Sequence, residues 1–112
     1  MKTKLLFICS NNLSRSPTAE ELFRDSDEYE AKSAGTHQSA RKVVTQELID
    51  WADIIFVMSE KNDHHLTHLD ENFDMTGKVV HDLDIPDFIY IRNDPALIEI
   101  LKTKLDIFGI SV

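Results

Sequence analysis

Continuous apolar runs alternate along this chain with segments of mixed polarity. In residues 4–8 and 54–58 nearly every side chain is apolar, which is the pattern of a strand buried on both faces. Residues 78–83, which contain the Val79–Val80 pair, and the shorter segment 29–33 also favour strands. The pattern therefore predicts four strands.

Helix signals lie between these runs. Pro17 suits a first helical turn, Thr45 and Asp94 are candidate N-caps, and Gly109 is a helix stop. The expected helices cover residues 17–24, 43–51, 59–69 and 96–108. Because strands that alternate with helices form a parallel sheet, we expect one α/β domain over residues 1–112, with helices on both faces of a small four-stranded parallel sheet. Gly35, after the second strand, is expected to provide a positive φ in a turn.

The first strand runs directly into a polar loop that starts at Cys9 and ends where a helix begins at Pro17. This order directs backbone N–H groups and the positive end of a helix dipole toward one place, which favours a bound dianion. The same field favours the ionised form of a cysteine, and Arg15 adds a planar fork for two phosphoryl oxygens. Cys9 and Arg15 together predict phosphoryl transfer through cysteine.

The composition of the chain argues against some classes of partner and location. The net charge of −8, from 20 acidic and 12 basic residues, argues against nucleic acid. No apolar run approaches the roughly 18 residues of a membrane-spanning helix, so we expect no membrane insertion. A lone cysteine excludes an internal disulfide and fits a reducing compartment, so the expected location is cytoplasmic.

The spacing Cys9-x5-Arg15, followed by Ser16-Pro17, resembles the phosphate-binding loop of the low-molecular-weight protein tyrosine phosphatases. The segments 33–36, 52–58 and 84–87 resemble later parts of that family, in the same order and in its short bacterial-type branch. The resemblance implies the flavodoxin-like architecture of the family and no metal or cofactor. It also implies that phosphate is held by Ser10, Asn11, Asn12, Leu13, Ser14, Arg15 and Ser16.

The resemblance also assigns chemical roles. Cys9 would attack phosphorus and form a cysteinyl phosphate, Arg15 would stabilise the phosphoryl oxygens, and Asp87 would be the general acid and base. Asp84 stays open as an alternative acid. Ser16 would hydrogen-bond the sulfur, and Asn12 would hold the loop in a left-handed conformation.

The implied substrate is phosphotyrosine in a protein, or a small aryl phosphate. The candidate residues that line its ring are Trp51, Phe88 and Tyr90.

Two loop positions depart from the family pattern. Asn11 stands where relatives commonly have glycine, so we expect it to adopt a positive φ at some cost in strain. Ser14 stands where many relatives have a second cysteine, so Cys9 is expected to lack rescue by an intramolecular disulfide.

Other functions fit parts of the sequence. A phosphoryl carrier also uses a strand-end cysteine, and a non-catalytic phosphate-binding module would need the loop alone. Arsenate reduction would require relay cysteines, and Cys9 is the only cysteine. His64, His65 and His68 could hold a metal, but no carboxylate–histidine motif accompanies them, so a solvated helix face is the favoured interpretation.

Overall fold

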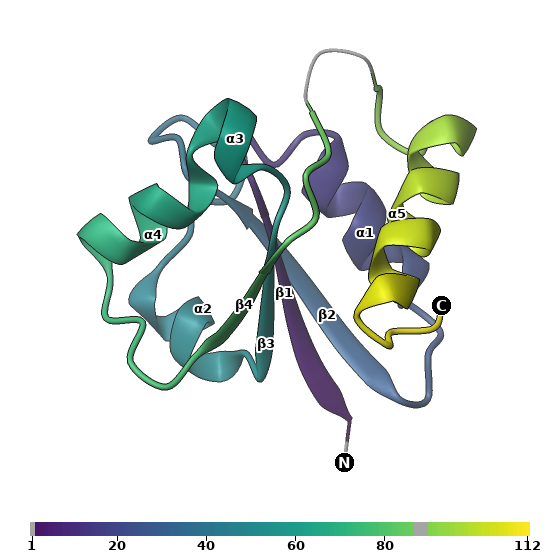
Figure 1. The fold of residues 1–112 in the computed structure, drawn as a ribbon, viewed down its shortest axis with the longest axis horizontal. Helices are drawn as coiled ribbons and strands as arrows, with labels where there is room; N and C mark the ends of the chain where they lie inside the picture. The colour runs from purple at the N-terminus through teal and green to yellow at the C-terminus, as the bar shows by residue number, and fades with distance from the viewer. Residues whose placement is uncertain (1, 87–89) are drawn as a thin grey trace.

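A computed structural model describes residues 2–86 and 90–112 of the chain. Its centre is a four-stranded sheet in which every described pair of neighbouring strands is parallel, in the order β2-β1-β3-β4 (Figure 1). The strands are β1 (Thr3–Cys9), β2 (Tyr29–Gly35), β3 (Ile54–Val57) and β4 (Val79–Asp82). The predicted sheet is therefore confirmed, including its strand number and direction.

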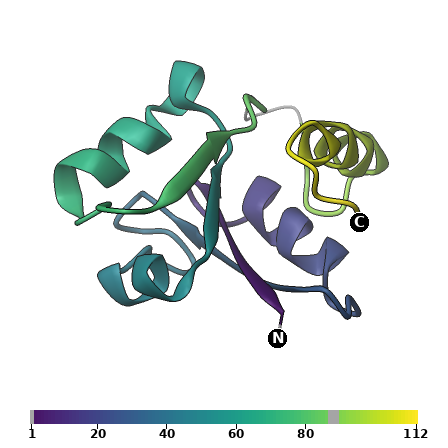
Figure 2. The same ribbon diagram turned by 60° about the horizontal axis from the view of Figure 1, so that its bottom comes forward.

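Helices cover both faces of the sheet, as the sequence predicts. They are α1 (Arg15–Leu22), α2 (Gln46–Trp51), α3 (Glu60–Asp63), α4 (His65–Asn72) and α5 (Pro95–Ile107). Figure 2 shows α1 and α5 on one face and α2 and α4 on the other. Within the described residues, no helix is long and apolar enough to cross a membrane.

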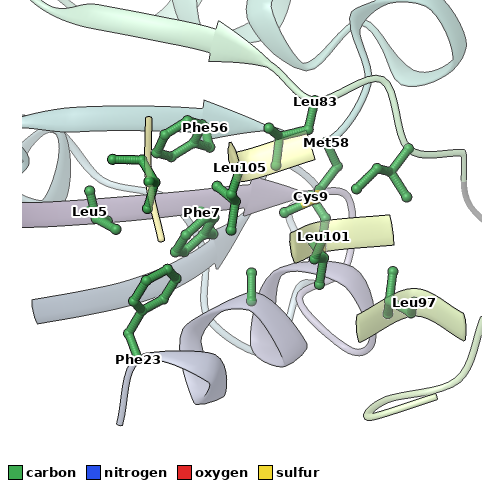
Figure 3. Close-up of a cluster of buried hydrophobic side chains, with 13 residues drawn as sticks. Leu5, Phe7, Cys9, Phe23, Phe56, Met58, Leu83, Leu97, Leu101 and Leu105 are labelled. Atoms are coloured by element: carbon green, nitrogen blue, oxygen red, sulfur yellow. The ribbon is translucent and has the colours of Figure 1, made fainter. Parts of the chain in front are cut away.

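Alternate residues of β1 point into two separate cores. Leu5 and Phe7 join the cluster that α1 and α5 cover, whereas Leu6 and Ile8 join the cluster under α2 and α4. All four side chains are fully buried, which explains why this strand is apolar throughout. Figure 3 shows the first cluster, in which Cys9 lies near Met58 and Leu101. The core thus fixes β1 firmly up to the residue where the polar loop begins.

The predicted helix caps are present. Thr45 Oγ1 accepts a hydrogen bond from the Leu48 amide at 3.2 Å, and an Asp94 carboxylate oxygen accepts one from the Ala96 amide at 2.9 Å. Gly109 follows α5 with a φ of 79°.

The single helix predicted over residues 59–69 is wrong. His64 adopts a left-handed conformation, with a φ of 54°, and separates α3 from α4. A hydrophobic pattern cannot reveal such a break, because the polar residues on both sides fit one helix equally well.

Candidate active site

Cys9 ends β1 at the carboxyl edge of the sheet, between the neighbouring strands β2 and β3. In an open parallel sheet, this edge at a change of strand order is where ligands bind. The Cys9 sulfur lies 3.2 Å from the amide nitrogen of Asn12, which donates to it, and 2.9 Å from Ser16 Oγ. A cavity of about 120 Å³ opens here, lined by Cys9, Asn11, Leu13, Ser14 and Arg15. The predicted nucleophile and the predicted cation therefore share one cavity.

The carbonyl groups of residues 9–12 all point away from this cavity. The carbonyl oxygen of residue 9 accepts a hydrogen bond from Thr36 N at 2.9 Å, and that of residue 10 accepts one from His37 N at 3.0 Å. Arg41 supplies the other two: its backbone N–H donates to the carbonyl of residue 11 at 3.1 Å, and its Nε–H donates to that of residue 12 at 3.0 Å. In a trans peptide the N–H points opposite to the preceding carbonyl. The amides of residues 10–13 are therefore turned to the other side, as the bond from Asn12 N to the sulfur shows. This row of amides is suited to an anion.

Gly35 makes this arrangement possible by being small. It lies in β2 directly opposite Cys9, and a Cβ there would meet Ser10 O at 2.5 Å and the Ala40 side chain at 2.7 Å. The prediction that Gly35 provides a positive φ is wrong, because its backbone belongs to the strand and only Gly77 and Gly109 have a positive φ among the described glycines. The physical reason for glycine here is close backbone approach.

Asn12 holds the loop from inside. It has a φ of 56°, as the resemblance implied, and its side-chain Nδ2 donates to Ser16 Oγ at 2.8 Å and to Ser33 Oγ at 2.9 Å. Ser33 Oγ in turn donates to a Glu20 carboxylate oxygen at 2.8 Å. Asn11 is not among the residues with a positive φ, so the strain expected at that position is absent and falls on Asn12 instead.

Arg15 is the first residue of α1 and is only 1% exposed. Its Nη1 donates to Asp63 Oδ2 at 2.9 Å and to the carbonyl oxygen of Ile85 at 2.8 Å. Two acceptors on this one nitrogen restrict the orientation of the planar guanidinium. Arg15 is therefore held rigidly beside the cysteine.

Trp51 is not brought to the loop. It ends α2, just before the amino end of β3, and its ring lies under the ammonium groups of Lys32 at 4.4 Å and Lys4 at 5.9 Å. Lys4 is at the start of β1, whereas Cys9 is at its end. This position is at the opposite edge of the sheet, so we remove Trp51 from the candidate substrate wall.

Four candidate residues lie in the segment after β4. Asp84 is exposed and has a φ of 52°. Its backbone amide donates a hydrogen bond to Asp82 Oδ1 at 2.8 Å. Tyr90 is partly buried and packs against the core cluster under α1 and α5. Asp87 and Phe88 lie outside the described residues, so their predicted roles stay predictions.

Sequence reasoning missed three residues that contact the loop. Arg41 binds it from behind, Asp63 binds Arg15, and His65 Nε2 lies 2.9 Å from Ser10 Oγ. His65 is fully buried, so the solvated helix face expected for it is wrong, although His64 is exposed. Among the described residues, no cluster of three His, Cys, Asp or Glu side chains could hold a metal ion.

A comparison with protein families supports the same class over part of the chain. The family model for low molecular weight phosphotyrosine protein phosphatase matches residues 4–52, from β1 through the loop to α2. Over these residues, the family model supports the resemblance that the sequence motifs indicate. No curated protein sequence matches the chain significantly.

Solved structures extend the similarity of fold over the whole chain. The tyrosine phosphatase Wzb from Escherichia coli K30, in complex with phosphate, has a TM-score of 0.73 at 20% identity, covering 97% of each chain. Vibrio vulnificus Wzb in complex with benzylphosphonate also has a TM-score of 0.73 at 20% identity, covering 97% of this chain and 98% of its own. The YwlE arginine phosphatase from Geobacillus stearothermophilus has a TM-score of 0.70 at 22% identity, covering 96% and 90%. The chain therefore has the low-molecular-weight phosphatase fold.

Proposed function

We propose that this protein is a phosphomonoester hydrolase that acts through a cysteinyl-phosphate intermediate. One observation carries the proposal: the Cys9 sulfur accepts a hydrogen bond from the Asn12 amide, and Cys9 lines the same small cavity as the buried Arg15. The Asn12 amide donates to the sulfur and Ser16 Oγ lies 2.9 Å from it, so the loop offers hydrogen-bond partners to a thiolate, which is the nucleophilic form of cysteine.

In the first step, the thiolate would attack phosphorus in line with the leaving oxygen. A sulfur–phosphorus bond forms, the phosphorus–oxygen bond to the leaving group breaks, and the leaving oxygen takes a proton from an acid. Loop amides and Arg15 would hold the three equatorial oxygens, where negative charge is spread in the transition state. In the second step, water attacks phosphorus, the sulfur leaves as thiolate, and the acid residue takes a proton from the water.

We propose Asp87 as that acid. The segment before it reaches the site, because the carbonyl of Ile85 accepts a hydrogen bond from Arg15 Nη1, and only Pro86 separates Ile85 from Asp87 in the chain. Asp84 is the alternative.

The proposed substrate is phosphotyrosine in a protein, or a small aryl phosphate. Leu13 lines the cavity and is 61% exposed, so it offers an apolar surface at the mouth for a ring. Two of the similar structures are tyrosine phosphatases and one is an arginine phosphatase, so phosphoarginine is the competing substrate to test.

The test is hydrolysis of para-nitrophenyl phosphate by wild type and by Cys9→Ser, with circular dichroism to verify that both are folded. We expect turnover by wild type and only the background rate in the variant. Equal rates would refute the cysteine mechanism. Tight binding of inorganic phosphate without turnover by wild type would instead favour a non-catalytic phosphate-binding module.

A second experiment addresses the acid. Asp87→Asn should lower the rate and remove the basic limb of the pH–rate profile on an aryl phosphate, because the leaving group then receives no proton. An unchanged rate and limb would move the acid to Asp84 or elsewhere. Parallel assays with phosphotyrosine peptide and phosphoarginine decide the substrate. The cytoplasmic location stays a prediction that rests on the lone cysteine.

A further inference from the structure

The break between α3 and α4 turns two side chains toward the phosphate loop. His64 has a left-handed backbone and a side chain that is 73% exposed, whereas its neighbours Asp63 and His65 contact Arg15 and Ser10. Figure 1 shows α3 at the edge of the sheet where β1 runs into α1. A left-handed residue other than glycine costs on the order of 1–3 kcal/mol and persists only where the surroundings enforce it. We call Asp63 and His65 together the Asp63–His65 clamp.

Asp63 fixes the plane of the Arg15 guanidinium. Its Oδ2 and the Ile85 carbonyl oxygen both accept hydrogen bonds from Arg15 Nη1, at 2.9 and 2.8 Å. Arg15 is 1% exposed and Asp63 is 17% exposed, so this ion pair is largely shielded from water, unlike an ordinary surface pair. Two acceptors on one terminal nitrogen leave the planar group little freedom to rotate.

His65 fixes Ser10, the residue that follows the nucleophile. The amide of Ser59 donates to His65 Nδ1 at 3.1 Å, so in the neutral ring the proton is on Nε2. Nε2–H then donates to Ser10 Oγ at 2.9 Å. The Asp63 carboxylate also lies on the Nε2 side, at 3.9 Å. This is not a serine–histidine–aspartate triad, because a protonated Nε2 cannot accept the serine proton.

We propose that the Asp63–His65 clamp is a positioning device that holds Arg15 and the start of the phosphate loop in the geometry of the transition state. The proposal rests on the proposed function. Asp63 and His65 touch no reacting atom and act through Arg15 and Ser10. Because a carboxylate beside the site also repels a dianion, the clamp serves the transition state and not ground-state phosphate binding.

The experiment compares Asp63→Ala with Asp63→Asn, which keeps an oxygen acceptor but removes the charge. For Asp63→Ala we expect kcat on para-nitrophenyl phosphate to fall about ten- to a hundredfold, because a misplaced guanidinium stabilises the transition state poorly. KM should not rise, since a repulsive charge has also been removed. Asp63→Asn should restore most of kcat. Asp70→Ala, at an exposed position of α4, is the matched control and should match wild type.

Binding measurements separate this proposal from the proposed function. Orthovanadate mimics the five-coordinate phosphorus of the transition state, so its affinity should fall with Asp63→Ala by about the factor seen in kcat, whereas the affinity for inorganic phosphate should not fall. These measurements require no turnover. A wild type that binds vanadate but hydrolyses nothing would refute the proposed function and leave the clamp to be judged by binding.

Because His65 is fully buried, its removal could unfold the protein. The hydrogen bond between His65 and Ser10 is therefore tested by substitution of Ser10. Ser10→Ala should lower kcat about fivefold, the equivalent of one hydrogen bond. The Asp63 part of the clamp is overturned if Asp63→Ala keeps the wild-type kcat and vanadate affinity, or if Asp63→Asn is as impaired as Asp63→Ala. The His65 part is overturned if Ser10→Ala behaves as wild type.

Discussion

Gly35→Ala should distort the phosphate loop from behind. The added Cβ would lie 2.5 Å from Ser10 O and 2.7 Å from Ala40 Cβ, and since one of these atoms belongs to the backbone, the strand and the loop must move apart. Overpacking of this kind costs about 1–3 kcal/mol. For a chain of this length, that corresponds to a fall in Tm of about 4 °C for each kcal/mol. Urea and thermal unfolding measure this loss.

The same substitution should lower kcat on para-nitrophenyl phosphate about tenfold or more, because a shifted Ser10 carbonyl moves the amides next to Cys9. Gly77→Ala is the matched control. Gly77 has a φ of 75° with nothing within 4 Å of an added Cβ, so it should lose about 1–2 kcal/mol of stability and no activity. The reasoning is refuted if Gly35→Ala has the stability and turnover of wild type, or if Gly77→Ala loses activity equally.

Three further substitutions test contacts of the described structure. Asn12→Ala removes two buried donors and leaves alanine in a left-handed conformation, so urea unfolding should show a loss of about 2–4 kcal/mol; a loss below about 0.5 kcal/mol would contradict this. Ser16→Ala removes the hydroxyl 2.9 Å from the Cys9 sulfur, and kcat should fall about tenfold in steady-state assays, with an unchanged kcat as the contrary result. Hydrogen bonds from the hydroxyl and amide of Thr67 lower the pKa of Glu60, so their stabilisation is present above the ordinary glutamate pKa and is lost as pH falls through the lowered value. Thr67→Val should therefore be less stable than wild type at neutral pH, and urea midpoints of the two should converge in acid; a constant difference would be evidence against this linkage.

Sequence alone determined the elements whose cause is local. The apolar run of β1 predicts a strand buried on both faces, and Thr45 and Asp94 cap the helices that they were expected to cap. The sequence also predicted that Cys9 and Arg15 share one site, because both residues belong to one loop whose ends are fixed by a strand and a helix. Short-range signals suffice where the interacting groups are near in the chain.

Only the tertiary structure decided how the loop is held. Asp63 meets Arg15 across 48 residues, and His65 meets Ser10 across 55. Nothing in the composition of the 59–69 segment distinguishes these side chains from a solvated helix face, because the pattern of polar and apolar residues does not encode the left-handed turn at His64. Gly35 shows the same limit: its sequence context suggests a turn, whereas its need for glycine comes from a backbone that only the folded sheet brings close.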